Sequence, residues 1–160
     1  MLAAAALMAS SNLVAATDLK VGFVRLEKLF KEAAPALKAQ KKLEKEFAAR
    51  DLELQKLGKQ ARDMQASLEK DGVTMSESER RDKEQELARL NRDLQRMQRE
   101  LREDLNLRKN EELAAVLERA QKVIQQIAES EKFDLILQEA VYINPRIDIT
   151  DRVIKALADK

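Results

Sequence analysis

The chain has 160 residues, of which 37% are charged and only 3% are aromatic, and its 30 basic and 29 acidic residues leave a formal net charge of +1. This balance is typical of long charged helices and provides no overall positive field for binding nucleic acid. The absence of Cys, His and Trp excludes disulfides, thiol nucleophiles, imidazole bases and the usual zinc ligand sets.

The first segment of the chain is apolar and carries no charge. Residues 2–9 are apolar, and small residues follow at Val14 and Ala16. An apolar stretch followed by small residues at this spacing is typical of a leader that signal peptidase removes. We therefore expect a signal peptide at residues 1–16 and a mature chain that is exported across a membrane. The alternative is an ordinary alanine-rich N-terminal helix.

A long helical hairpin is predicted over residues 36–131, with a turn near residues 71–76. Apolar residues recur in steps of three and four on both sides of this turn, as in helices that pack along one seam. In the first helix they are Ala36, Leu43, Phe47, Leu54, Leu57, Ala61, Met64 and Leu68, and in the second Leu87, Leu90, Leu94, Met97 and Leu101. Polar Gln40 and Arg50 occupy the two missing places in the first series. The seam predicts that the two helices pack against each other.

The turn itself contains helix stop and start signals. Gly72 can adopt the left-handed conformation that ends many helices, and Ser76 with Glu79 matches a capping box for the second helix. Gly58, inside the first helix, marks either a flexible point or a close approach of the second helix.

The second helix, near residues 77–130, is longer than the first. Its apolar register fails at Asp104 and Arg108, and a new series begins with Leu113, Leu117, Ala120, Ile124 and Ile127. A change of register predicts a change of partner. The half near the turn should pack on the first helix, and the other half on the body of the protein or another subunit.

Strand-forming residues lie at the two ends of the mature chain. We expect strands at residues 19–24, 134–137 and 140–143, a helical turn at 25–32, and a final helix at 151–158 capped by Thr150 or Asp148. The predicted fold class is α+β, mostly α, with a body formed by residues 17–35 and 132–160. About 45 residues rarely make a stable core without disulfides or metals, so we expect oligomerisation. The expected body residues are Val21, Phe23, Val24, Phe133, Leu135, Ile136, Leu137, Val141, Tyr142 and Ile143.

Several features follow one another along the chain in a specific order. They are the leader, a strand with Val21-Gly-Phe23-Val24 before Leu29-Phe30, the charged hairpin, and Asp148-Ile-Thr150-Asp151 before a short helix. In this order they resemble the Skp (OmpH-like) family of periplasmic outer-membrane-protein chaperones over nearly all of the mature chain. The resemblance implies a homotrimer whose bodies join into a barrel-like core. It also implies three arms that enclose unfolded outer-membrane proteins without using ATP.

Charged and apolar residues on the arms suggest contact surfaces. Arginines recur along one line of the second helix at Arg89, Arg92, Arg96, Arg99 and Arg102. This line is either a solvated face paired with neighbouring acids or a basic strip that attracts anionic lipid, lipopolysaccharide or acidic client segments. Acidic residues interrupt it, which argues against a DNA-binding basic zipper. Under the family resemblance, the candidates for client contact are Leu52, Val73, Met75, Leu105 and Leu107.

The sequence offers no catalytic constellation. Its many carboxylates lie on solvated helices that lack the desolvated pocket needed to tune a pKa, and its three glycines form no phosphate-binding loop. We therefore expect a chaperone that is not an enzyme and uses no cofactor or metal. The alternative is a structural coiled-coil protein that scaffolds components of the cell envelope.

Overall fold

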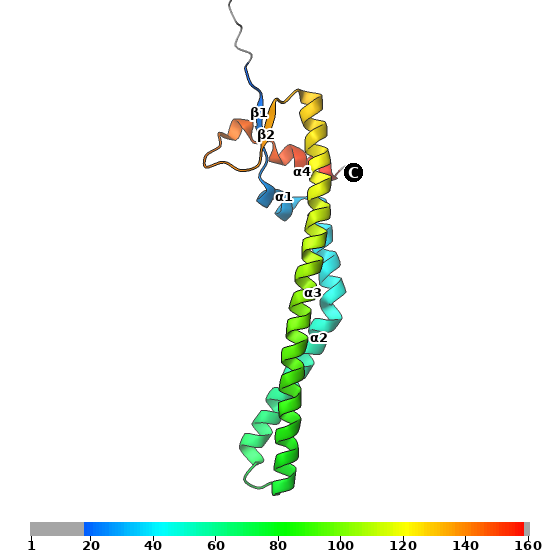
Figure 1. Ribbon diagram of the computed structural model, residues 1–160, viewed down its shortest axis with the longest axis vertical. Coiled ribbons are helices and arrows are strands. Elements are labelled where there is room, and N and C mark those ends of the chain that lie inside the picture. The colour runs from blue at the N-terminus through cyan, green and yellow to red at the C-terminus, as the bar shows by residue number, and fades with distance from the viewer. Residues whose placement is uncertain (1–17, 159–160) are drawn as a thin grey trace, which may run out of the picture.

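The computed structural model describes residues 18–158, so the leader predicted at residues 1–16 lies outside the described part of the chain. Helices dominate the fold, and two short strands lie at one end of it (Figure 1). The elements in chain order are β1 (Val21–Phe23), α1 (Leu26–Glu32), α2 (Ala34–Asp71), α3 (Glu77–Glu131), β2 (Leu135–Leu137), a 3₁₀ turn (Pro145–Ile147) and α4 (Thr150–Ala158).

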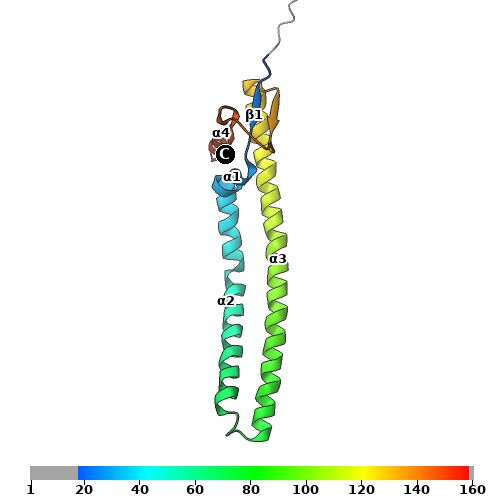
Figure 2. The ribbon, with the colours of Figure 1, turned by 90° about the vertical axis from the view of Figure 1, so that its left-hand side faces the viewer.

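Helices α2 and α3 form the predicted antiparallel hairpin and lie side by side in both views (Figures 1 and 2). They have 38 and 55 residues, or about 57 and 83 Å at 1.5 Å per residue. Every apolar position of the predicted seam is buried or half-buried. The mostly helical fold class and the hairpin are therefore confirmed.

The turn between α2 and α3 occupies residues 72–76. Ser76 caps α3 as predicted: its hydroxyl accepts from the Glu79 amide, and the Glu79 carboxylate accepts from the Ser76 amide. The prediction of a left-handed glycine was wrong, because Gly72 has φ −58° and ψ −27°. A Cβ at Gly72 would instead lie 2.3 Å from the Leu68 carbonyl oxygen. Glycine is required there by close approach of the backbone.

A two-stranded parallel sheet joins the two ends of the described chain. Val21 pairs with Leu135 and Phe23 with Leu137, and the whole hairpin serves as the long crossover that a parallel pair needs. Beyond β1, the Phe23 carbonyl accepts a hydrogen bond from the Ile149 amide at 2.9 Å.

The strand predicted at residues 140–143 does not form. Val141 is fully exposed and Tyr142 is 80% exposed. A strand is stable only where its backbone groups find partners, and no other described segment pairs with this one. Because strands need such backbone partners, β1 and β2 are also limited to three residues each.

The core lies where the chain ends meet the root of the hairpin. Val24, Leu29, Ile149, Val153 and Leu157 come from the termini. The root of the hairpin adds buried residues to the same cluster: Ala36, Ala39, Val116, Ala120, Val123 and Ile124. The second register of α3 packs on α4, as the prediction of a contact with the body requires, and α2 remains a partner there. The core is larger than predicted because the roots of α2 and α3 contribute to it.

Among residues 18–158, no helix is long and apolar enough to cross a bilayer.

Candidate functional site

The two sides of the α2–α3 seam differ near the root of the hairpin. On one side, three ion pairs join the helices: Lys42 Nζ to Glu112 Oε1 at 2.5 Å, Arg50 Nη1 to Asp104 Oδ2 at 2.6 Å, and Arg108 Nε to Glu46 Oε1 at 3.0 Å. We call these three pairs the ion-pair ladder. They hold together the stretch in which apolar residues leave the seam.

The ladder shifts the pKa values of two of its members. Hydrogen bonds to the Glu46 carboxylate, and then to that of Glu111, raise the pKa of Arg108. A hydrogen bond from Lys42 holds the pKa of Glu112 below its usual value, against a smaller opposing effect of burial. Both shifts favour the charged forms of Arg108 and Glu112.

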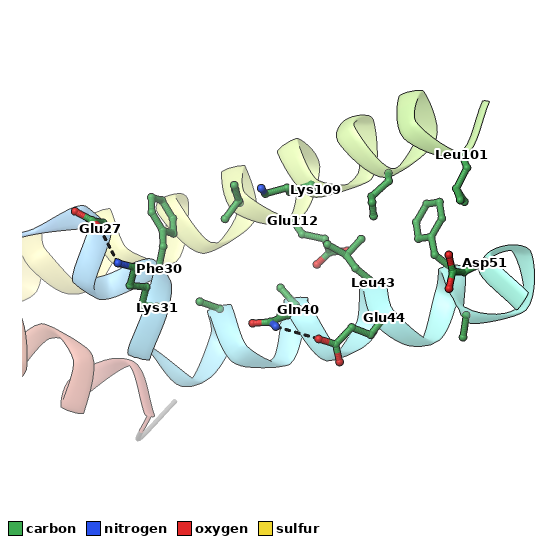
Figure 3. Close-up of a pocket in the computed structure, with 16 residues that line it drawn as sticks. Glu27, Phe30, Lys31, Gln40, Leu43, Glu44, Asp51, Leu101, Lys109 and Glu112 are labelled. Atoms are coloured by element: carbon green, nitrogen blue, oxygen red, sulfur yellow. Dashed lines mark hydrogen bonds and ion pairs between the residues drawn. The ribbon is translucent and has the colours of Figure 1, made fainter. Parts of the chain in front are cut away.

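On the other side of the seam, the helices leave an apolar groove with a volume of about 910 Å³. We call it the root groove, because α1 closes one end of it near the root of the hairpin (Figure 3). Large apolar side chains from three helices line it: Phe30, Leu43, Phe47, Leu101, Leu105 and Leu113. The ladder therefore closes one side of the seam while the other side stays open.

Three charged residues that line the root groove form no ion pair among the described residues: Glu44, Asp51 and Lys109. Gln40 donates to Glu44 at 2.9 Å and Gln55 donates to Asp51 at 2.7 Å, so both carboxylates of the α2 rim receive only neutral amides. Lys109, on the α3 rim, forms no ion pair within the described chain. The α2 rim is thus acidic, and the α3 side of the groove carries Lys109 and Glu112 (Figure 3), of which Glu112 pairs with Lys42 of the ladder.

The predicted client-contact residues fall in several places. Leu105 lines the root groove, whereas Leu107 lies outside it and is 59% exposed. Val73 and Met75 lie together at the tip of the hairpin. Leu52 borders a shallow depression farther along α2. The structure therefore brings together only the tip pair.

The basic strip lies on α3 outside the seam with α2. At 3.6 residues per turn, Arg92 and Arg99 are displaced from the seam by about half a helical turn, and Arg89, Arg96 and Arg102 by about a third of a turn. All five side chains are exposed. Of these five, Arg96 is the one that forms an ion pair within residues 18–158, with Asp93 at 2.9 Å.

The body residues divide between the interior and the surface. Phe23 and Val24 are buried in the core of the chain itself, and Ile136 and Phe133 pack against that core. Four others are exposed on the body: Leu135, Leu137, Val141 and Tyr142. Since β1 pairs with β2 on one side only, the outer edge of β2 carries backbone groups with no strand partner in the described chain. Exposed apolar residues beside a free edge provide a surface for another chain.

Two clusters of hydrogen bonds and ion pairs join the terminal segments to each other, and the second also joins them to the hairpin. Thr150 accepts from the Arg25 amide at 2.9 Å, and Asp148 accepts from the Thr150 amide at 3.0 Å while its carboxylate pairs with Arg25 at 2.7 Å. Glu131, at the end of α3, pairs with Lys20 and Arg152. The Glu131 cluster therefore ties the end of α3 to both terminal segments.

The root groove was not predicted from the sequence. The sequence predicts Leu105 as a residue for client contact, but the groove also needs Phe30 of α1 at its end. No spacing pattern in the sequence places α1 there. Among the described residues, no group of acidic side chains is arranged to hold a metal ion.

Comparison with known proteins places this architecture. The family model described as "Outer membrane protein (OmpH-like)" matches residues 20–157, which include every described element except the last residue of α4. The chain belongs to the OmpH-like family. Chaperone protein Skp of Yersinia enterocolitica is 28% identical over 152 residues, covering 94% of this chain and 91% of the relative. Chaperone protein Skp of Blochmanniella pennsylvanica is 28% identical over 132 residues, covering 82% and 80% of the two chains.

A solved structure shares the fold of this OmpH-like chain. The crystal structure of a protein described as an outer membrane chaperone (OmpH-like) from Caulobacter crescentus CB15 matches with a TM-score of 0.71 at 17% identity, covering 89% of this chain and 86% of the other. The predicted resemblance is therefore confirmed. The relatives support a chaperone over the alternative of an envelope scaffold.

Proposed function

We propose that this OmpH-like chain is an ATP-independent holdase of the periplasm that binds unfolded outer-membrane proteins and prevents their aggregation. The observation that carries the proposal is a long charged arm, with isolated apolar side chains on its surface, that projects from a core confined to its root (Figure 2). Such a surface can shield an unfolded chain through many weak contacts without holding it in one conformation.

The exposed apolar residues of the arm support this mode of binding. Leu52 is 53% exposed, Leu107 is 59% exposed and Val73, at the tip, is 95% exposed. Each alone buries little area on contact, so each contributes little affinity. Several arms acting on one client would raise the overall affinity through effective concentration.

The free edge of β2 supports assembly into a homotrimer. Leu135, Leu137 and Tyr142 would be covered by neighbouring subunits, and three bodies joined in this way would hold three arms around one cavity. The basic strip of each arm would then attract acidic client segments, anionic lipid or lipopolysaccharide. The predicted leader supports export to the periplasm.

The test uses the mature chain, starting at Thr17. An outer-membrane β-barrel protein is unfolded in urea and diluted into buffer without nucleotide, and aggregation is followed by light scattering. We expect a molar excess of trimer to suppress the scattering. Undiminished scattering at that excess would overturn the proposed function.

A variant separates assembly from the arm itself. Leu135→Asp with Leu137→Asp places charges on the free edge of β2 and should give a monomer by light-scattering mass. We expect the monomer to keep its helical circular dichroism and to suppress aggregation less well. A wild-type chain that is itself monomeric would exclude the trimer.

A further inference from the structure

We propose that the root groove binds one amphipathic β-strand segment of an unfolded client, with the alternate apolar side chains of that segment seated between α2 and α3. This inference rests on the proposed function and assigns a specific site within the arm. It differs from the cavity between arms, because the groove lies within a single hairpin.

The seam between α2 and α3 is asymmetric near the root of the hairpin. Helices that meet along an apolar seam normally bury it from both sides. Here the ion-pair ladder closes one side, while Leu105 on the other side is 39% exposed. Phe30 of α1 closes the end of the opening. The ladder thus joins α2 and α3 beside the groove, and its residue Glu112 also lines the groove.

The root groove has the length of a short β-strand and an apolar floor. Its lining residues on α2 extend from Ala36 to Asp51, which is about 22 Å at 1.5 Å per residue. A β-strand of about seven residues has the same length at about 3.3 Å per residue. The floor of the root groove is apolar and its rims are charged. A segment that fits the groove is therefore apolar on one face and polar on the other. Strands of outer-membrane barrels alternate apolar and polar residues in this way.

Charged side chains without ion-pair partners in the described chain lie on both rims of the root groove. Glu44 and Asp51 lie exposed on the α2 rim with only neutral amide partners, and Lys109 on the α3 rim forms no ion pair among the described residues. The other charged residue of α3 in the lining, Glu112, is already paired with Lys42. The charges of Glu44, Asp51 and Lys109 match a segment whose polar side chains include a cation near α2. In a segment whose apolar residues follow one another without interruption, half of the apolar side chains would point away from the groove into water. Such a segment would also provide no polar side chains for the charges on the rims.

The experiment measures binding of two fluorescent ten-residue peptides to the mature wild-type chain by anisotropy. Both peptides contain equal numbers of Leu and Phe, and of Ser and Lys. In one the apolar and polar residues alternate, and in the other all apolar residues are contiguous. We expect the alternating peptide to bind about tenfold more tightly, as expected when one apolar face is buried and the other stays in water. Equal binding, or tighter binding of the contiguous peptide, would overturn the proposal.

Two matched pairs of variants locate the site. Ala48 lines the groove and its neighbour Ala49 does not, and both are exposed. Ala48→Trp should fill the groove and weaken binding about tenfold, whereas Ala49→Trp should leave it unchanged. Leu105→Ser should weaken binding of the alternating peptide several-fold, whereas Leu107→Ser, which removes one isolated apolar side chain outside the groove, should weaken it much less. Circular dichroism checks that each variant keeps its helices.

The outcomes separate this inference from the proposed function. If wild type suppresses aggregation but Ala48→Trp and Ala49→Trp bind the alternating peptide equally, the groove proposal fails and the holdase stands. If wild type binds the peptide through Ala48 but does not suppress aggregation, the holdase fails and the groove stands as a peptide site.

Discussion

Arg50 and Asp104 interrupt the apolar seams of α2 and α3 at positions that face one another, and the Arg50 Nη1 atom lies 2.6 Å from Asp104 Oδ2. Each residue alone is a defect in the pattern of its helix. Together they form a cross-arm ion pair that is available in only one register of the hairpin. These two polar residues therefore specify how α2 and α3 align along the hairpin.

A charge swap tests this alignment. Arg50→Asp and Asp104→Arg each place like charges at the crossing and should lower the free energy of unfolding, and the double variant should recover most of that loss. Because the pair is partly exposed, we expect a coupling of about 0.5 kcal/mol. Urea unfolding measures it, and the coupling should shrink in 1 M salt because salt screens exposed charges. Strictly additive effects would show that the pair does not form.

We expect opposite effects on stability when Gly58, inside α2, and Gly72, directly after α2, are each replaced by alanine. A Cβ at Gly58 would lie 3.6 Å from Arg62 and 3.8 Å from Leu94, which is ordinary contact. Gly58→Ala should therefore stabilise the helix by about 1 kcal/mol. At Gly72 the same change places Cβ against the Leu68 carbonyl and should destabilise the turn by about 1 kcal/mol or more. Thermal unfolding of both variants checks the pair, and equal signs would contradict it.

Lys132 ends α3 in the left-handed conformation, with φ 56° and ψ 49°. A residue with a Cβ is strained there, whereas glycine is not. Lys132→Gly should stabilise the chain by about 1 kcal/mol in urea unfolding. Lys132→Ala keeps the Cβ and serves as the control, with no stabilisation expected. A loss of stability in the glycine variant would mean that the Lys132 side chain matters more than its backbone.

Acid should release the contact between Arg25 and Asp148. Burial tends to raise the pKa of Asp148, but hydrogen bonds from Thr150 and the charge of Arg25 outweigh it and leave the pKa below its usual value. A carboxyl whose pKa is lower in the folded chain stabilises the fold above its unfolded value. That contribution is lost as the pH falls through the folded value. We therefore expect it to be complete above about pH 4 and to decline below that.

Asp148→Asn tests this pH dependence. The variant should melt at a lower temperature than wild type at pH 7, and the difference should narrow as the pH falls below about 4. Asp151→Asn removes the carboxylate of the exposed pair with Lys28 and controls for loss of an acid near α4. A melting difference that is constant from pH 7 to pH 3 would contradict the prediction.

The sequence predicted the regular parts of the molecule well because their causes are local. Steps of three and four identify the seam from Leu43 to Leu101, and the Ser76 cap depends on residues only three positions apart. The failed strand at residues 140–143 shows the limit, since its residue types suit a strand but no described segment pairs with it. Gly72 was correctly identified as the stop, but for a backbone reason that the sequence pattern does not contain.

Local pattern alone determined that this chain makes a long charged hairpin with its strand-forming residues at the ends. Tertiary structure decided where that hairpin is closed and where it is open. The ladder joins residues 54 to 70 positions apart, and the root groove exists because α1 lies across the end of the seam. Contacts between residues so distant in sequence arise from the meeting of helix faces, and periodicity within one helix cannot specify which faces meet.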